Sequence, residues 1–262
     1  MSEEAVLLVE KKDGVATLTL NRPKALNALS FDLRAAFVAA LGEIASDGQT
    51  RVAILTGNGR AFCAGLDLKE LGGETGASGN PFGRDRHFGV VDALDACPIP
   101  VIGAINGFAI TGGFELALAC DFLVASTDAR FADTHARVGI VPGWGLSQRL
   151  SRLIGIGRAK EVSLTGNFVS AEKALEWGLV NRVVAPDKLL PTCLGLAADI
   201  QSCVPEVVAL YKKLIDDGFS KTLEEGRAIE VRAAASWKAT PEQIAERRQL
   251  VQERGRKQSE TD

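Results

Sequence analysis

Histidine is scarce in this chain and its cysteines are dispersed, which limits the metal and disulfide chemistry open to it. The 262 residues include two histidines, His87 and His135, and five cysteines without a C-x-x-C pair. Protein zinc sites need clustered histidine and thiolate ligands, and the H-E-x-x-H pattern is absent from the sequence. An odd number of dispersed cysteines behind a polar N-terminus is typical of reduced thiols. We therefore expect no metal, no disulfide framework and a cytoplasmic location.

An excess of charge of either sign is also missing. The formal net charge at pH 7 is -3, and acidic and basic residues are mixed along most of the chain. Without a basic stripe, the chain has no general attraction for nucleic acid or for an anionic membrane. We expect no nucleic-acid partner, and an anionic ligand would need local recognition.

Long uninterrupted apolar runs are missing too. Residues 99–120 come closest to the length of a membrane span, but Asn106, Thr111 and Glu115 interrupt them, and the glycine pair that begins at Gly112 would break a helix. A buried strand, a turn and a buried helix explain this stretch better. We therefore expect no membrane partner.

Motifs for nucleotides and for serine hydrolases are absent. The sequence contains no Gly-Lys-Ser/Thr and no G-x-S-x-G, and Lys160 stands where a dinucleotide fingerprint beginning at Gly155 would need its third glycine. We expect no bound cofactor.

The first two thirds of the chain have the pattern of an α/β protein. A hairpin is predicted around the turn-forming Asp13-Gly14, and a helix is predicted to begin after Ser30 and to end before Gly48. Short apolar runs predict buried strands, and an apolar helix at 112–120 falls between the last two. The predicted strands are 6–10, 15–20, 52–56, 101–105 and 122–125.

Beyond residue 184 the pattern becomes entirely helical. Three helices are predicted at 189–202, 206–217 and 221–237. A fourth begins with Thr240 as N-cap and Pro241 in its first turn. We therefore divide the chain into a core, residues 1–185, and a helical region, residues 186–262. A glycine-rich loop is predicted within the core at 72–83.

Two segments of the core combine small residues with a polar group. Glu115 lies in the otherwise apolar, glycine-rich segment 106–121, and because burying an unpaired carboxylate is costly, Glu115 needs a chemical reason. The segment 61–68 follows a strand, and its small residues let a backbone approach a ligand closely. Together the two segments look like the halves of an acyl-thioester site.

Four segments, in order along the chain, resemble the crotonase family, also called the enoyl-CoA hydratase/isomerase superfamily. They are residues 21–29 (NRPKALNAL), 62–67, 106–121 and 139–150. The resemblance implies an α/β fold built as a spiral of β-β-α units. It also implies a helical C-terminal region that packs trimers, often paired as hexamers.

The resemblance further implies a binding site for an acyl-CoA thioester. When a proton moves at the carbon next to a thioester carbonyl, the oxygen gains negative charge, which backbone N–H groups can stabilise. The family pattern assigns these donors to Ala64 and Gly112, and it places coenzyme A, which is part of the substrate and not a cofactor, beside two loops. The residues implied in substrate binding are Lys24, Ala25, Leu26, Ala64, Gly65, Leu66, Asp67, Leu68 and Gly112.

Three of these assignments have a simpler alternative that the sequence leaves open. Lys24 could be a solvated surface lysine, because a lone lysine specifies no phosphate geometry. Asp67 could be only the N-cap of a short helix, and Gly112 only part of a tight turn.

Glu115 and His135 are the candidate proton-transfer groups. Glu115 matches a glutamate that positions or activates water in family hydratases, although it could also be a first-turn acid that stabilises a helix dipole. At His135 the chain departs from the family, whose hydratases usually have a second glutamate there. Syn addition of water needs one group to take a proton from water and one to deliver a proton to carbon. His135 could deliver that proton, oriented by Asp133 or Glu115, or it could be a structural histidine beside the site.

The resemblance therefore predicts reversible hydration of a trans-2-enoyl-CoA to the 3-hydroxyacyl-CoA by a homotrimer or hexamer. Because the unperturbed pKa of histidine lies near neutrality, a role for His135 predicts a limb of the pH–rate profile near neutral pH. An enoyl-CoA isomerase, or another enolate reaction run by a single base, is the alternative within the fold. A noncatalytic acyl-CoA-binding protein is the alternative from another class.

Overall fold

The computed structural model describes residues 5–71 and 89–259. The predicted loop at 72–83 and His87 lie outside the described residues. The chain forms two compact units, Met1–Ala209 and Leu210–Asp262. This division falls later than the one we drew at 185/186, because the first helix after that point packs on the core: its buried residues Leu189, Cys193 and Ala197 share an apolar cluster with strand residues.

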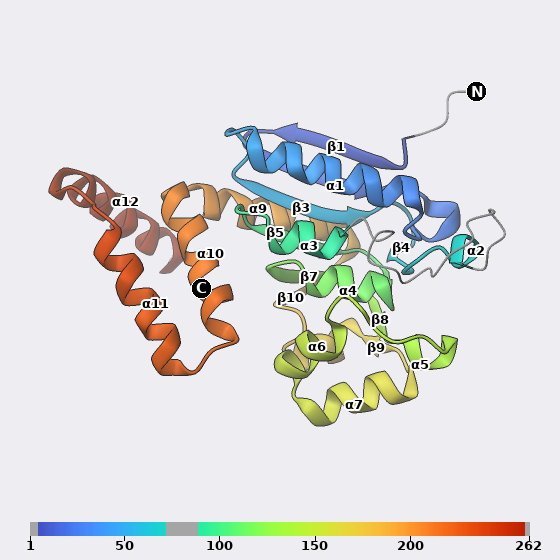
Figure 1. Cartoon of the computed structure of the whole chain (residues 1–262). Helices are drawn as coiled ribbons and strands as arrows, with labels where there is room; N and C mark the ends of the chain where they lie inside the picture. The colour runs from blue at the N-terminus through green and yellow to red at the C-terminus, as the bar shows by residue number, and fades with distance from the viewer. Residues whose placement is uncertain (1–4, 72–88, 260–262) are drawn as a thin grey trace. The chain divides into compact units, whose positions relative to one another are not determined.

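A six-stranded sheet forms the centre of the first unit (Figure 1). Its order is β1 (Leu7–Lys12), β2 (Val15–Leu20), β3 (Val52–Gly57), β5 (Val101–Ile105), β7 (Phe122–Ser126) and β10 (Arg182–Val184). Only the predicted hairpin β1–β2 is antiparallel; the other neighbours pair in parallel. Every residue of β5 is buried, as expected for a parallel strand covered on both faces.

The chain also forms a second sheet of four short strands. Its order is β4 (Ala61–Cys63), β6 (Phe108–Ile110), β8 (Arg130–Ala132) and β9 (Val169–Ser170). The pairs β3/β4, β5/β6 and β7/β8 each send one strand into each sheet, and a helix follows each pair. This repeat is the β-β-α unit that the resemblance implied, although the sequence pattern alone did not reveal the short strands.

Helices connect these strands along the chain. They are η1 (Pro23–Ala25), α1 (Phe31–Ser46), α2 (Leu68–Leu71), α3 (Val90–Asp95), α4 (Gly112–Leu118), α5 (His135–Val138), α6 (Leu146–Ile154), α7 (Ile156–Thr165), α8 (Ala171–Glu176), η3 (Pro186–Lys188) and α9 (Leu189–Gln201). The predicted N-cap of α1 is confirmed, since the Ser30 hydroxyl accepts a hydrogen bond from the Leu33 N–H. Along α1, Leu33, Phe37, Leu41 and Ile44 recur at helical spacing and are buried.

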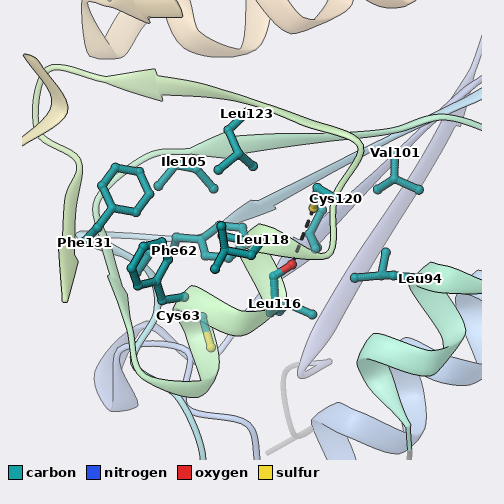
Figure 2. Packing of buried hydrophobic residues seen from close by; sticks show 14 of the residues in the cluster. Phe62, Cys63, Leu94, Val101, Ile105, Leu116, Leu118, Cys120, Leu123 and Phe131 are labelled. Carbon is teal, nitrogen blue, oxygen red and sulfur yellow. Dashed lines mark hydrogen bonds between the residues drawn. The ribbon is translucent and has the colours of Figure 1, made fainter. Parts of the chain in front are cut away.

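Helix α4 is held rigidly inside the core, and it carries the candidate carboxylate. Figure 2 shows Leu116 and Leu118 of α4 among Phe62 of β4 and Phe131 of β8, all of them nearly or fully buried. At the C-terminal end of α4, the Cys120 thiol donates a hydrogen bond to the Leu116 carbonyl at 3.7 Å. A helix packed in this way fixes the position of any side chain that it points out of the core.

The second unit, together with the last turn of chain before it, is made of helices. Helix α10 (Pro205–Phe219) leads into α11 (Leu223–Ser236) and α12 (Pro241–Ser259), as the sequence predicted. Thr222 and Glu225 form a reciprocal capping box at the start of α11. Neither α10 nor α11 contains a buried residue.

The apolar stretch at 99–120 forms β5, β6 and α4, so it is not one helix. Within the described part of the chain, no single helix is long and apolar enough to cross a membrane, and one pair bent by 106°, Pro186–Gln201 with Pro205–Phe219, passes by length and composition only.

Candidate active site

A cavity of about 880 Å³ opens in the first unit where the turns after β4, β6 and β8 meet. Glu115, His135, Thr111 and Thr134 supply its polar lining near the start of α4. Its other lining residues are Ala64, Leu66, Val91, Asp92, Asp95, Gly112, Val138, Gly139, Ile140, Val141, Gly143, Trp144, Gly145 and Arg149. The volume falls in the range of small-molecule sites.

The backbone N–H groups of Leu66 and Gly112 lie close together at one wall of this cavity. A Cβ placed on Gly112 would lie 3.5 Å from the Leu66 nitrogen, and a Cβ on Gly65 would lie 3.1 Å from the Gly112 nitrogen. The described residues offer neither the Leu66 N–H nor the Gly112 N–H an acceptor within hydrogen-bonding distance. Both N–H groups are therefore open to a ligand in the cavity.

Ala64 does not fit the donor role that the resemblance gave it. Its N–H donates to the Leu26 carbonyl at 3.0 Å, so its single hydrogen is already used. The neighbouring peptides show why: the Leu29 N–H bonds to the Gly65 carbonyl, and the Asp67 N–H bonds to the Leu29 carbonyl. These bonds fasten residues 64–67 against residues 26–29 and leave the Leu66 N–H as the available one.

Glu115 lies on α4 and is 3% exposed. Its Oε1 accepts hydrogen bonds from the Trp144 N–H at 2.8 Å and the Leu146 N–H at 3.3 Å. These bonds compensate for burial of the carboxylate and fix its rotation. Because Oε1 is occupied, Oε2 is the oxygen that remains for chemistry, and Glu115 lines the cavity.

His135 lies between two carboxylates. Its Nδ1 is 2.6 Å from Asp133 Oδ1, and its Nε2 is 3.6 Å from Glu115 Oε2. Burial by itself lowers the pKa of His135, but its interactions with Asp133 and Glu115 outweigh burial and raise the pKa to about 9. Burial favours a higher pKa for Asp133, yet hydrogen bonds from His135 and Ser163 hold that pKa below its usual value. At neutral pH, His135 is therefore an imidazolium whose Nδ1–H is held by Asp133.

A family model described as Enoyl-CoA hydratase/isomerase matches residues 10–258. The chain belongs to the enoyl-CoA hydratase/isomerase family. It is 40% identical to probable enoyl-CoA hydratase 1, peroxisomal, of Arabidopsis thaliana, over 98% of this chain and 96% of that protein. It is also 40% identical to the short-chain-enoyl-CoA hydratase of Clostridium acetobutylicum, over 90% of this chain and 91% of that protein.

A solved structure supports the same assignment. The enoyl-CoA hydratase of Bacillus anthracis superposes with a TM-score of 0.85 at 36% identity, covering 95% of this chain and 96% of that chain. The predicted family and the crotonase-like fold are confirmed. Trimer packing by the C-terminal helices stays a prediction.

The structure separates the residues that we predicted to bind coenzyme A in this family member. Ala64, Leu66 and Gly112 line the cavity, whereas Lys24 and Ala25 are exposed on η1 and do not line it. Leu26 does not line the cavity either, and its carbonyl accepts the Ala64 N–H. Gly65 is buried with φ at 93°, and Leu68 begins α2.

Asp67 is used structurally on both of its oxygens. Oδ1 accepts from the Lys69 N–H at 3.2 Å, and Oδ2 pairs with Arg22 at 2.9 Å. The bond from the Lys69 N–H is that of a helix N-cap, the simpler alternative considered for Asp67 from the sequence. Its role in holding coenzyme A stays a prediction.

Sequence reasoning missed three features of the site. The Trp144 and Leu146 N–H groups that anchor Glu115 gave no signal, because backbone donors are invisible in a residue pattern. Leu66 was grouped with the substrate-binding loop and not recognised as the donor. The third feature is the backbone conformation of Thr111, which has a positive φ, and the glycines at the start of α4 were only a weak sequence signal for it.

Among the described residues, no group of three or more His, Cys, Asp or Glu side chains could hold a metal ion.

Proposed function

We propose that this chain catalyses the reversible addition of water to a trans-2-enoyl-CoA, giving the 3-hydroxyacyl-CoA. The observation that carries the proposal is the Glu115–His135 pair, with 3.6 Å between Oε2 and Nε2, in the cavity bordered by the Leu66 and Gly112 N–H groups. The family membership and the named hydratases among its relatives support the same activity.

The two N–H groups act on the thioester carbonyl. As water adds to C3, negative charge moves onto the carbonyl oxygen, and donors aimed at that oxygen stabilise the enolate. We assign this role to Leu66 together with Gly112, because the Ala64 N–H is bonded to Leu26. Loss of one such donor typically costs roughly 10²- to 10³-fold in rate.

Glu115 and His135 divide the proton transfers. Glu115 Oε2 takes a proton from water, the water oxygen bonds to C3, and the C2–C3 π electrons move toward the carbonyl oxygen. The His135 Nε2–H then delivers its proton to C2, which completes the addition and restores the carbonyl. Transfer of the proton from Glu115 to His135 returns both groups to their starting states, so atoms and charge balance over the cycle.

This division explains how the site can work with histidine in place of a second glutamate. A proton donor has to be protonated at the working pH, and the raised pKa of His135 keeps it so. Asp133 holds the Nδ1–H and so leaves the Nε2–H facing Glu115. We therefore assign the orientation of His135 to Asp133, which is one of the two carboxylates that the sequence offered for this role.

Crotonyl-CoA turnover tests the proposal. The purified protein should convert crotonyl-CoA to 3-hydroxybutyryl-CoA, followed by loss of the enoyl-thioester absorbance and by mass analysis of the product. Conversion of a 3-enoyl-CoA to the 2-enoyl-CoA without hydration would instead identify the isomerase. Binding of butyryl-CoA in calorimetry without turnover of either substrate would identify a noncatalytic binder, and the hydratase proposal would fail.

The same proposal includes an assembly and a location. We propose a homotrimer or a dimer of trimers, supported by the large apolar side chains that α10 and α11 leave exposed. A cytoplasmic site of action without a cofactor, a nucleic-acid partner or a membrane partner stays the expectation from composition.

A further inference from the structure

Thr111, at the turn between β6 and α4, has a backbone conformation that its side chain opposes. Its φ is 53° and its ψ is -113°. Positive φ is uncommon outside glycine, and for a β-branched residue it is a clear outlier. Of the described non-glycine residues with positive φ, namely Asp13, Leu26, Asn27 and Thr111, only Thr111 is β-branched and lines the cavity. Conformations of this kind persist only where neighbouring contacts hold them, and they cluster at functional sites.

The contacts that hold Thr111 can be identified on both of its sides. Its N–H continues the β6–β8 ladder by bonding to the Ala132 carbonyl at 2.9 Å. Its hydroxyl is hydrogen-bonded to the Thr134 hydroxyl and also accepts the Thr134 N–H at 3.3 Å. Thr111 is buried and Thr134 is half-buried, so water reaches this pair of hydroxyls only in part.

The geometry connects this strain to catalysis. The ψ angle of Thr111 sets the direction in which the following peptide, and therefore the Gly112 N–H, points. Thr134 directly precedes His135 and follows Asp133 in the chain. The hydroxyl pair therefore ties the turn that presents the Gly112 N–H and Glu115 to the turn that presents His135.

We propose that Thr111 and Thr134 are positioning residues: their hydroxyl pair holds the Gly112 N–H at the thioester carbonyl and fixes the position of that N–H relative to His135. The inference rests on the proposed acyl-thioester site and adds to it the residues that set its alignment. A glycine at position 111 would adopt the same φ without strain but would also adopt others, so the direction of the Gly112 N–H would no longer be fixed. Thr134 has ordinary backbone angles, φ -98° and ψ 12°, so its hydroxyl can be removed without a backbone penalty.

The test measures the carbonyl itself, using butyryl-CoA labelled with ¹³C at the thioester carbon. Isotope-edited infrared difference spectra report the stretching frequency of the bound carbonyl, which hydrogen-bond donors lower. The wild-type protein should lower this frequency relative to free butyryl-CoA. Thr134→Val, which keeps the shape and removes the hydroxyl, and Thr111→Gly should move it back toward the free value. Binding affinity in calorimetry should change by no more than about threefold, because the carbonyl hydrogen bond is one of many contacts that a bound acyl-CoA makes.

Two further variants separate positioning from simple loss of structure. Thr111→Ser keeps the hydroxyl and should keep the wild-type frequency. Thr165→Val removes a hydrogen-bonded hydroxyl that does not line the cavity, and it should leave the frequency unchanged. Crotonyl-CoA turnover provides a second readout: kcat should fall roughly 10- to 100-fold in Thr134→Val and Thr111→Gly, with KM nearly constant. This fall in kcat is no larger than the loss expected when a whole oxyanion donor is removed.

A carbonyl frequency in Thr134→Val equal to that of the wild type would overturn the positioning role. So would a wild-type protein that binds butyryl-CoA without lowering the frequency. Failure of the hydratase proposal looks different, because the frequency would be lowered while crotonyl-CoA is not hydrated.

Discussion

Glu115 uses its two oxygens for different tasks, and this division makes a clean substitution possible. In Glu115→Gln, the side-chain carbonyl can still accept from Trp144 and Leu146, so the loop that carries these donors should stay in place. The amide cannot take a proton from water. We expect kcat for crotonyl-CoA hydration to fall roughly 10²- to 10⁴-fold while butyryl-CoA binding in calorimetry changes little. A near-normal kcat in this variant would move the base to another residue.

His135 should give the pH–rate profile its alkaline limb. The sequence alone suggested a limb near neutrality, but Asp133 and Glu115 raise the pKa of His135 to about 9. A donor is active in its protonated form, so kcat should be level through neutral pH and fall as pH rises through about 9. His135→Ala should lower kcat roughly 10²-fold or more and lack this limb. An unchanged hydration rate in His135→Ala would make the residue structural and favour single-base chemistry.

Asp133 should control the position of that limb. In Asp133→Asn, the side chain can still accept from the His135 ring but no longer carries the negative charge that favours the imidazolium. The pKa of His135 should therefore fall, and the alkaline limb of kcat should move toward neutral pH. The pH–rate profile of the variant, measured beside that of the wild type, checks the direction. A limb that stays in place would assign the raised pKa to Glu115 alone.

At the scale of elements, the contact between β4 and the start of α4 determines where both oxyanion donors lie. A Cβ added at Gly113 would lie 2.0 Å from the Cys63 carbonyl oxygen, and both groups are backbone or fixed to it. Gly113→Ala should therefore cost about 1–3 kcal/mol of unfolding free energy and reduce turnover as well. Denaturant unfolding checks the first effect and crotonyl-CoA hydration the second.

Gly42 offers the matched control on α1. Its added Cβ would meet nothing within 4 Å, and the residue is exposed inside a helix. Gly42→Ala should therefore raise the unfolding free energy by about 0.5–1 kcal/mol, since glycine costs more backbone entropy than alanine. Equal effects of the two substitutions would show that α4 can move away from β4.

Elements with a strong local signal were predictable, and those defined by a tertiary contact were not. The Ser30 cap, the Asp13-Gly14 turn and the apolar run of β5 each have a local cause, and the structure has a matching element at each place. Strands β4, β6 and β8 are three residues long, too short for a period to appear. The candidate site shows the same division: Glu115 and His135 stood out by type, whereas the Leu66 donor depends on which N–H groups other segments use.

At the scale of the whole molecule, the helical second unit has apolar surface to cover. Tyr211, Ile215 and Phe219 recur every four residues along α10, and each is at least 60% exposed. Residues at this spacing share one face of a helix. An apolar stripe of this kind marks a protein–protein contact, and a second copy of this chain is the partner that the family resemblance implies.

Oligomeric mass tests this last inference. Sedimentation equilibrium should give a particle of three or six copies of the 27.7 kDa chain. Tyr211→Asp with Phe219→Asp places charges on the apolar stripe, so the particle should become smaller, and its melting temperature should fall and depend more strongly on protein concentration. Ser220→Asp adds a carboxylate beside Phe219 without removing apolar surface, and it should keep the wild-type mass. A wild-type protein that sediments as a monomer at micromolar concentration would contradict the assembly, because its exposed stripe would then have no second copy to cover it.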